Sequence, residues 1–409
     1  MSTIFPPTHT RRLAETTFND VLIVGAGIAG CAAAIALASR GVRVSLIEKQ
    51  PVWRFQSSGI FVYGNGLQSF GELGVMNEVL AAGFPVAHGR NVYLDHLGNP
   101  IVDVDYPSPA DGVPPILGIK RADIHRVLAA RLEGLGVQAQ LDMRLVGLKS
   151  RSDGVQAELS DGSTQHFDLV IGADGIRSQI RQWVAGDITP RYTGLGVWRS
   201  VHARPAGLTD KIMMMGVGKR LGIMPISQDR LYLFGTVAEP AGSHYEPARW
   251  PELMRERFAE FGAPARQFLD QIDAQAEVIY TAVEEVALPL PWHAKRVLLI
   301  GDAAHASTPF MGQGGAMAIQ DAVVLGNLLD ECLDIDALLQ RFGTLRYPMC
   351  RFVQEASRKV GEAGAVETSG DCAERDRILR EHAQAQVDHF YAELKRLATL
   401  GRQDIFSSL

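Results

Sequence analysis

Residues 21–48 contain a short apolar run, a glycine-rich turn, a stretch of small residues and a second apolar run. The turn reads Gly-Ala-Gly-Ile-Ala-Gly over residues 25–30. In a strand–turn–helix unit, the first glycine allows a tight turn, the second lets backbone approach a pyrophosphate, and the third lets the helix pack closely on the sheet. Glu48 ends the second run 18 residues after Gly30, where a carboxylate can bind ribose hydroxyls. The pattern predicts a dinucleotide site formed by Gly25, Ala26, Gly27, Ile28, Ala29, Gly30, Glu48 and the adjacent Lys49. The turn alone does not distinguish FAD from NAD.

The apolar stretch over residues 21–38, preceded by Arg11 and Arg12, imitates a membrane span or a twin-arginine signal. Acidic residues after the arginine pair, and glycines within the stretch, favour a soluble strand–turn–helix, with residues 1–17 as a polar tail. The net charge of −6 gives no indication of nucleic-acid binding, which usually requires clustered positive charge. The four scattered cysteines form no Cys-x-x-Cys pair, so we predict no metal site and a reducing, cytoplasmic location without membrane attachment.

Three short apolar runs, at residues 21–24, 169–171 and 297–300, each end at a glycine, as central parallel strands do when both faces are buried. Residues 91–106 and 191–237 instead alternate apolar and polar side chains, which is typical of antiparallel sheet. The predicted fold is α/β, with a discontinuous Rossmann-like cofactor domain, an inserted antiparallel-sheet domain and a C-terminal helical segment. The predicted boundaries are 18–85, 111–182 and 286–341 for the cofactor domain, 86–110 and 183–285 for the substrate domain, and 342–409 for the helical region.

The second and third runs lead into turns that also suit a nucleotide cofactor. After residues 169–171, Asp174 either binds the cofactor or caps the turn by accepting backbone N–H groups. After residues 297–300, Asp302 stands just past the strand end, where ligands bind in open α/β sheets. A helix then begins near Gly314 with no acidic residue in its first turn, so its positive end is free to face an anion. We predict cofactor contacts from Asp174, Asp302, Gly312, Gly314 and Gly315.

In these three segments the chain resembles the flavoprotein aromatic-ring monooxygenases typified by para-hydroxybenzoate hydroxylase, salicylate hydroxylase and hydroxypyridine-carboxylate oxygenases. The matching motifs are GAGIAG with Glu48, ADGIRSQIR, and GDAAH followed by P, GQG and DA, and they span residues 20 to about 330. The resemblance implies that FAD is bound by the residues above together with Arg54 and Arg121. It also implies that NADH or NADPH binds transiently, because no second dinucleotide turn is present.

The activity implied is hydroxylation of a small phenolic or hydroxypyridine-like substrate with O2, through a flavin hydroperoxide. The substrate is expected between the flavin and the inserted sheet, beside Pro309, Arg199 and Tyr232. Each has a plain alternative: Tyr232 packs on the sheet, Arg199 pairs with a surface carboxylate, and nearby methionines fill the core. The proton-handling group and the oligomeric state, monomer or homodimer, stay open.

Other functions on this scaffold fit less well. Flavin-dependent halogenases carry a Trp-x-Trp-x-Ile-Pro stretch, in which none of the five tryptophans here stands. Epoxidases and isoprenoid reductases usually need membrane attachment or a long lipid slot, and no anchor is visible in the sequence. A non-catalytic binding protein, such as the carriers of prenylated GTPases, would lack the intact segment of residues 312–315.

Overall fold

The structure is a computed structural model of the 409-residue chain and describes residues 19–55, 58–332 and 334–403. The predicted polar tail, the first residue of the first predicted domain range and the end of the helical region lie outside the described residues. No helix in the described part of the chain is long and apolar enough to cross a membrane.

The predicted cofactor domain is organised around a six-stranded sheet with the order β18-β19-β12-β1-β2-β8. All neighbours in this sheet are parallel except the edge pair β18 and β19. Its central strands β1, β12 and β19 come from the three apolar runs, which confirms that these distant segments are adjacent. The strands are β1 (Asp20–Val24), β2 (Arg43–Ile47), β8 (Ala139–Gln140), β12 (Leu169–Gly172), β18 (His293–Ala294) and β19 (Val297–Leu299).

Helices pack around this sheet and carry most of the turns of interest. Helix α1 packs against α9 and α4, and the all-apolar segment over residues 31–37 of α1 is fully buried. A helix that is apolar on every side lies either in a protein core or in a membrane, and this one is enclosed in the core by α9 and α4. The helices are α1 (Ile28–Ala38), α4 (Arg121–Gly134), α5 (Ile180–Ala185), α8 (Asp302–His305), the 3₁₀ helix η2 (Pro309–Met311) and α9 (Gly314–Glu331).

The second large sheet has seven strands in the order β17-β13-β16-β15-β14-β5-β6 and is antiparallel except for the pair β14 and β5. Its strands come from residues before and after the apolar run 169–171, as the alternating patterns predict. One face packs on a core that includes Trp198, Phe258, Phe261 and Phe268. The strands are β5 (Arg90–Asp95), β6 (Pro100–Asp105), β13 (Arg191–Ala203), β14 (Lys211–Met215), β15 (Lys219–Pro225), β16 (Arg230–Ala238) and β17 (Val278–Glu285). The helices between β16 and β17 are η1 (Pro247–Arg249), α6 (Trp250–Arg257) and α7 (Arg266–Leu269).

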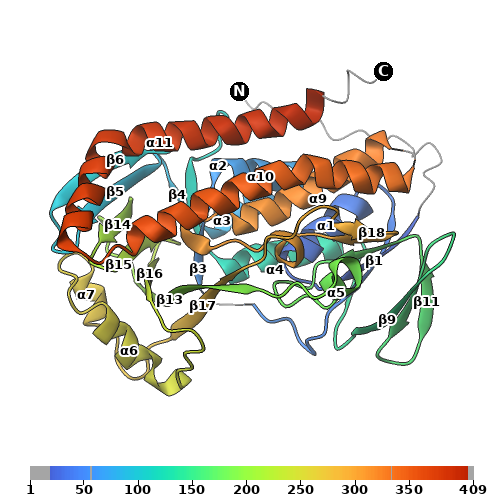
Figure 1. The fold of residues 1–409 in the computed structure, drawn as a ribbon, viewed down its shortest axis with the longest axis horizontal. Helices are drawn as coiled ribbons and strands as arrows, with labels where there is room; N and C mark the ends of the chain where they lie inside the picture. Colours follow the sequence, from blue (N-terminus) through green and yellow to red (C-terminus); the bar gives the residue numbers. More distant parts are fainter. Residues whose placement is uncertain (1–18, 56–57, 333, 404–409) are drawn as a thin grey trace.

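The other face of the seven-stranded sheet, here called the inner face, packs against a small sheet with the order β3-β7-β4. Glycines allow the close approach: a Cβ at Gly118 would lie 1.8 Å from the carbonyl oxygen of Pro225, and one at Gly59 would lie 2.4 Å from the Tyr232 ring. The elements here are β3 (Gly59–Tyr63), α2 (Gly64–Glu72), α3 (Met76–Ala82), β4 (Phe84–Val86) and β7 (Ile116–Lys120). A separate meander of β9 (Leu145–Ser150), β10 (Val155–Leu159) and β11 (Thr164–Phe167) lies at the opposite end of the molecule in Figure 1.

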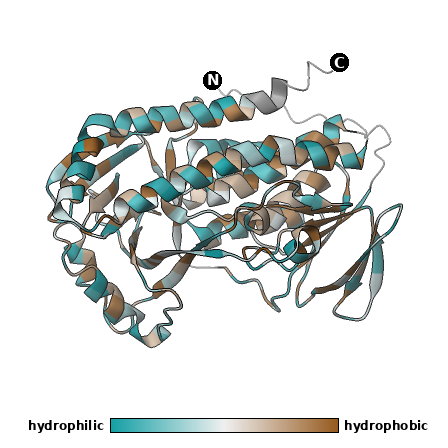
Figure 2. Ribbon diagram, viewed as in Figure 1, coloured by the Kyte–Doolittle hydropathy of each residue, from teal (hydrophilic) through white to brown (hydrophobic). Residues whose placement is uncertain are grey.

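Two long helices, α10 (Ile335–Gly364) and α11 (Ser369–Gln403), run along one side of the molecule in Figure 1. The predicted start of the helical region at residue 342 falls inside α10, because Asp334 caps the helix earlier by accepting from the backbone N–H of Ala337. Figure 2 shows mostly hydrophilic residues along α11, interrupted by hydrophobic ones. Phe390 and Leu394 of α11 are buried, so this helix is part of the packed structure.

Candidate cofactor and substrate site

The turn after β1 uses its three glycines in two different ways. Gly25 has φ +103°, and a Cβ there would lie 2.5 Å from the carbonyl oxygen of Ala173. A Cβ at Gly30 would lie 1.8 Å from the carbonyl oxygen of Gly25, so both glycines are required by packing. Gly27 precedes α1, and a Cβ there would meet no atom within 4 Å. The backbone at Gly27 therefore borders open space, as a pyrophosphate site requires.

Glu48 lies at the end of β2 and holds this turn in place. Its Oε2 accepts from the backbone N–H of Ala26 and its Oε1 from that of Gln50, both at 3.0 Å. A carboxylate has further acceptor capacity, so these bonds leave room for ribose hydroxyls. Lys49 beside it is exposed, whereas Ile28 and Ala29 are half-buried in the first turn of α1.

Helix α4 contributes a contact that the sequence analysis overlooked. Arg121, predicted to contact FAD, is the first residue of α4 and is exposed. One turn later, the Nε2 of His125 lies 2.7 Å from the carbonyl oxygen of Ala26, to which it donates. Burial lowers the pKa of His125, so the neutral ring makes this bond. The signal for His125 in the sequence is its four-residue spacing from Arg121, which places both residues on one face of a helix. Arg54 is exposed in the loop between β2 and β3, and the rings of its neighbours Trp53 and Phe55 each lie 5.1 Å from the His125 ring, which is bonded to the turn.

Asp174 follows β12, and its side chain is committed to its own turn. Its Oδ1 accepts from the hydroxyl of Ser178, and its Oδ2 accepts from the backbone N–H groups of Gln179 and Ile180. This is the capping role that we considered as the alternative to cofactor binding. The buried Arg181 then ties the segment to the third turn by donating to the carbonyl oxygen of Ala303 at 3.0 Å.

Asp302 is the first residue of α8, just past β19, and its side chain is exposed. The preceding Gly301 has φ +59°, and a Cβ there would lie 2.8 Å from the Cβ of Ala29 in α1. This close approach brings the third turn against the first one. Asp302 therefore lies at the carboxyl edge of the sheet next to the glycine-rich turn, as predicted for a ligand of the cofactor.

The loop from Pro309 to Gly315 enters α9. Gly312 has φ +63°, and the Phe61 ring occupies the space of its missing side chain, because a Cβ would lie 2.0 Å from that ring. At Gly314 and Gly315 a Cβ would make only ordinary contacts, at 3.6 and 3.5 Å. The backbone at Gly314 and Gly315 is therefore not tightly enclosed by other parts of the chain, and that at Gly27 borders open space. The N-terminus of α9, which has no acidic residue in its first turn, suits the electron-rich edge of a flavin.

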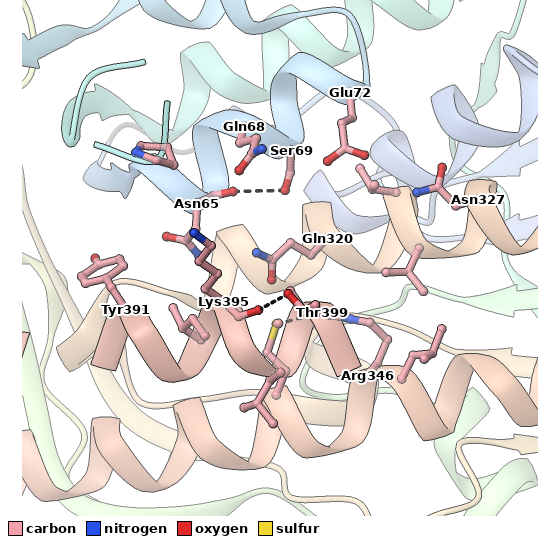
Figure 3. Close-up of a pocket in the computed structure, with 18 of the residues that line it drawn as sticks. Asn65, Gln68, Ser69, Glu72, Gln320, Asn327, Arg346, Tyr391, Lys395 and Thr399 are labelled. Carbon is pink, nitrogen blue, oxygen red and sulfur yellow. Dashed lines mark hydrogen bonds between the residues drawn. The ribbon is translucent and has the colours of Figure 1, made fainter. Parts of the chain in front are cut away.

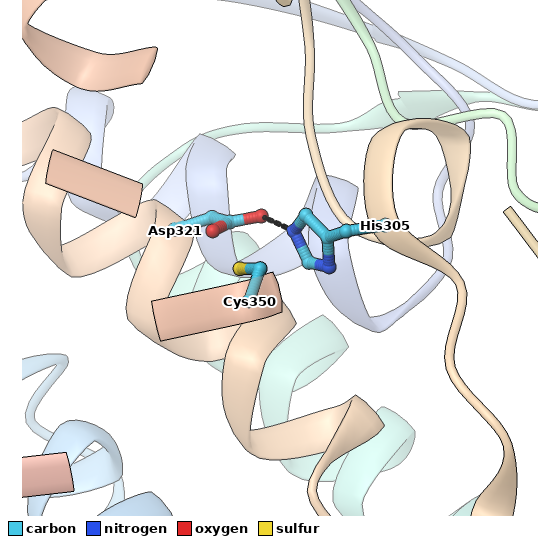
Figure 4. Close-up of side chains that lie close together, drawn as sticks. All are labelled: His305, Asp321 and Cys350. Atoms are coloured by element: carbon cyan, nitrogen blue, oxygen red, sulfur yellow. Dashed lines mark hydrogen bonds and ion pairs between the residues drawn. The ribbon is translucent and has the colours of Figure 1, made fainter. Parts of the chain in front are cut away.

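A buried ionic network supports this loop, and part of the network is drawn in Figure 4. Asp321 of α9 accepts from the backbone N–H of Gly301 and from Arg346 Nε, and its Oδ2 lies 2.7 Å from the Nε2 of His305. Burial opposes ionisation of Asp321, but His305 and Arg346 lower its pKa to about 2. Burial likewise opposes protonation of His305, yet Asp321 and Cys350 raise its pKa well above the ordinary value. The acceptors of Asp321 are thus taken up by protein groups, and we assign the cluster to support of the α8–α9 turn rather than to a metal.

Two of the predicted substrate-side residues, Arg199 and Tyr232, meet on the inner face. Arg199 Nε donates to the Tyr232 hydroxyl at 3.1 Å, and its Nη1 donates to the Thr281 hydroxyl at 2.8 Å. Neither partner is the surface carboxylate considered as the alternative for Arg199. Burial raises the pKa of Tyr232, and Arg199 opposes this shift only partly. Pro309, the third predicted residue, is exposed at the start of η2.

A cavity of about 670 Å³ lies elsewhere, between α2, α9, α10 and α11 (Figure 3). Asn65, Gln320, Tyr391 and Lys395 are among the residues that line it. None of the predicted cofactor or substrate residues lines this cavity. Asn65 links it to the cofactor loop, because the Asn65 Nδ2 donates to the Gln313 Oε1 at 2.9 Å.

Comparison with known proteins agrees with this geometry. Residues 19–357 match the FAD binding domain family. The chain is 31% identical to an aurachin C monooxygenase/isomerase of Stigmatella aurantiaca, over 90% of this chain and 95% of that one. It is 33% identical to a 2-heptyl-3-hydroxy-4(1H)-quinolone synthase of Pseudomonas aeruginosa, over 88% and 93% of the two chains.

The fold also matches a crystal structure of Klebsiella pneumoniae HpxO complexed with FAD and uric acid. The TM-score is 0.82, the sequence identity is 26%, and the match covers 93% of this chain and 97% of that one. The three segments that converge on one sheet edge, the family match and these relatives agree. This chain belongs to the family of FAD-dependent aromatic monooxygenases.

Proposed function

We propose that this enzyme hydroxylates a small aromatic or heteroaromatic ring, with FAD as cofactor and NADH or NADPH as the transient reductant. Of the relatives above, one is named for a hydroxyquinolone and another was solved with uric acid, and both compounds contain a nitrogen heterocycle fused to a second ring. The observation that carries the proposal is the closeness of the cofactor loop to the inner face. The Phe61 ring touches the position of Gly312 on one side and lies 5.7 Å from the Phe234 ring of the inner face.

When bound, FAD would supply the redox chemistry, which is the two-electron reduction of O2 at the expense of the nicotinamide, so that one oxygen atom enters the ring and the other leaves as water. The chain positions the cofactor. In this proposal Gly27 and the α1 N-terminus bind the pyrophosphate, Glu48 binds the adenosine ribose, and Asp302 binds the ribityl chain. The N-terminus of α9 at Gly314 stabilises negative charge on the flavin ring.

On the substrate side, we assign to Tyr232 the donation of a hydrogen bond. Its hydroxyl oxygen accepts from Arg199, so its own proton remains available to a substrate oxygen. Since burial raises its pKa, Tyr232 stays protonated and acts as a hydrogen-bond donor rather than as a base. Phe234 and Met224 beside it are buried, so this part of the inner face excludes water, which protects oxygen transfer from wasteful peroxide release.

We also propose a cytoplasmic location. The four cysteines are buried and unpaired, as expected for a protein kept in a reducing compartment. The oligomeric state, monomer or homodimer, remains a prediction that sedimentation analysis tests directly.

The experiment is to load the purified protein with FAD and screen hydroxylated quinolines, phenolic acids and purines for stimulated NADH or NADPH oxidation. We expect at least one compound to give a product that carries one atom of ¹⁸O from ¹⁸O2, detected by mass spectrometry, with matching nicotinamide consumption. Formation of hydrogen peroxide alone with every compound would contradict hydroxylation. An epoxide or a reduced product would instead support the related epoxidases and reductases.

A further inference from the structure

The cavity between α2, α9, α10 and α11 lies outside the site assigned to the proposed function, yet it has the size of a ligand site. Its volume of about 670 Å³ falls within the range of about 300–1,000 Å³ that small-molecule sites occupy. On α9 its lining residues run from Gln320 to Glu331 at helical spacings that keep them on one face. With a rise of about 1.5 Å per residue, this face extends for about 16 Å. The cavity is therefore elongated along α9.

Apolar side chains from three helices line much of this length. Val324 of α9, Leu345 of α10 and Leu397 of α11 are half-buried, so each leaves apolar surface that a ligand can cover. The other large apolar side chains that line the cavity are buried, and they are Val323, Leu328, Met349 and Leu394. A hydrocarbon chain bound here would be removed from water, which strengthens binding about fourfold for each methylene group.

One end of the cavity carries a free positive charge. Figure 3 shows Asn65, Gln320 and Lys395 toward this end and Glu72 toward the other. Within the described part of the chain, neither the Gln320 amide nor the Lys395 ammonium forms a hydrogen bond or an ion pair. Lys395 is exposed, so a ligand can reach this end from solvent.

The other charged residues that line the cavity have partners within the protein. These are Arg346 with Asp321, Glu331 with Arg341, Asp388 with Gln384, and Glu72. Lys395 therefore provides the charge that a ligand can neutralise. A carboxylate is a suitable counterpart, because an ammonium group donates strong, charge-assisted hydrogen bonds to it.

We propose that this cavity is a second ligand site and that it binds a linear aliphatic carboxylate. The carboxylate bonds to the Lys395 ammonium and to the free Gln320 amide, and the hydrocarbon chain lies along α9 toward Leu397. None of the residues predicted to bind FAD or the aromatic substrate lines this cavity, so the inference goes beyond the proposed function.

Two sets of contacts connect the cavity to the cofactor loop. The side-chain amides of Asn65 and Gln313 exchange hydrogen bonds of 2.9 and 3.4 Å, and Gln313 is the N-cap residue of α9. The Tyr391 ring lies 6.0 Å from the Tyr63 ring, which lies 5.5 Å from the Phe61 ring beside the loop. A ligand that contacts Asn65 or Tyr391 therefore acts on side chains that support the loop. We expect its binding to change the affinity for FAD, and FAD to change its affinity by the same factor.

The test is isothermal titration calorimetry of the FAD-loaded protein with four probes: octanoate, decanoate, octanol and octylamine. We expect decanoate to bind about tenfold more tightly than octanoate, because two further methylene groups are buried. Octanoate should bind about tenfold more tightly than octanol or octylamine, because only the carboxylate pairs with Lys395. Absence of decanoate binding would overturn the proposal. Octylamine or octanol that binds as tightly as octanoate would equally overturn it, since the site would not select a carboxylate.

Variants locate the bound probe. Lys395→Met should weaken octanoate binding about tenfold and leave octanol binding unchanged, because it removes the charge and keeps a long side chain. Ala398→Trp should abolish binding of both probes, since Ala398 lines the cavity and an indole there fills it. Arg396→Met and Ala385→Trp are the matched controls, because both residues lie on α11 outside the cavity lining and Arg396 pairs with Glu393. Circular dichroism establishes that each variant is folded. If octanoate binds normally to Lys395→Met and Ala398→Trp, it binds elsewhere and the assignment is wrong.

The connection to the cofactor loop is measured separately, by FAD titration with and without saturating decanoate. We expect decanoate to change the dissociation constant for FAD about fivefold or more in the wild type, and to have little effect in Ala398→Trp, whose cavity is filled. An FAD affinity that decanoate leaves unchanged in the wild type would overturn the connection. These measurements need no aromatic substrate, so their outcome is independent of whether the enzyme hydroxylates a ring.

Discussion

At the carboxyl edge of the six-stranded sheet, the candidate site is made mainly of backbone, whereas on the inner face of the seven-stranded sheet it is made of side chains. At the edge, Gly25, Gly30 and Gly301 create close approaches that no other residue allows. On the inner face, Arg199, Lys211 and Arg220 project from regular strands whose backbone would accept many residues. The edge therefore suits a cofactor common to a family, and the inner face suits a substrate that differs between its members.

The strongest expected difference lies in stability. Asp321→Ala removes the buried partner of Arg346 beneath the cofactor loop, and an uncompensated buried charge costs about 3–5 kcal/mol. Asp330→Ala on the same helix is the control, because its pair with Arg40 is partly exposed and is worth about 0–1 kcal/mol. Urea unfolding of both variants provides the measurement. Similar losses in the two would show that the network does not support the edge.

A second prediction concerns pH and the inner face. The pKa of Lys211 is about 7 in the folded protein and near its ordinary value of 10.5 when unfolded, so below pH 7 the folded protein carries the full cost of a buried charge. Between these two values the unfolded chain binds the extra proton, and wild-type stability rises with pH. Lys211→Met should therefore be more stable than wild type at pH 6, by a margin that shrinks by about 2–3 kcal/mol at pH 9.

Unfolding of both proteins at a series of pH values, without added ligand, tests this. Lys219→Met should show no such trend, because its ammonium pairs with Glu260. If the stability advantage of Lys211→Met over wild type instead grows with pH, the lysine is not buried as a cation.

A third prediction separates the two uses of glycine at the edge. Gly30→Ala should lower the free energy of unfolding by about 1–3 kcal/mol, because its Cβ would overlap the carbonyl group of Gly25. Gly27→Ala should leave that stability unchanged, since a Cβ there meets no atom within 4 Å, but it should weaken FAD binding by filling the pyrophosphate site. Unfolding without FAD and FAD titration measure the two effects. Normal FAD affinity in Gly27→Ala would remove this glycine from the cofactor site.

The last prediction concerns Tyr232→Phe, which is expected to cause only a small loss of stability. Loss of the hydroxyl that accepts from Arg199 should cost about 1 kcal/mol and leave FAD binding intact. The fraction of nicotinamide oxidation that ends as peroxide should increase, because the substrate loses a hydrogen bond. Tyr192→Phe, which removes a hydroxyl bonded to the Glu239 carbonyl oxygen, controls for loss of a buried bond. If the fraction of nicotinamide oxidation that ends as peroxide is unchanged in Tyr232→Phe, this tyrosine has a packing role only.

The backbone site could be predicted from the sequence because each of its requirements is local. Glycine at fixed offsets after an apolar run reports the turn directly, and β1, β12 and β19 were found in this way. The roles of Asp174 and Asp302 were harder to separate. Both follow strands, and only the structure shows that Asp174 caps its own turn while Asp302 is exposed.

The side-chain site could not be predicted to the same depth, because it depends on contacts between distant segments. Lys211 begins a strand and resembles an ordinary surface lysine, and only its two-residue spacing to Met213 and Met215 hints at the buried face. The network of Asp321, His305 and Arg346 joins three helices, and no local sequence pattern predicts it. The start of α10 was misplaced because its cap, Asp334, was not recognised.

The order of strands in the six-stranded sheet has a consequence for the synthesis of this enzyme. Val21 pairs with Leu169, and Val170 pairs with Val297, so the middle of the sheet joins segments that leave the ribosome far apart in time. Until β19 and α9 emerge from the ribosome, one edge of β12 is unpaired. Gly301, which packs against the first glycine turn, is also not yet in place. Such long-range pairing slows folding, because long loops must close before the contacts stabilise them. The proposed FAD site combines the first and third turns, so FAD is expected to bind late and to stabilise a sheet that the chain completes only when β19 has formed.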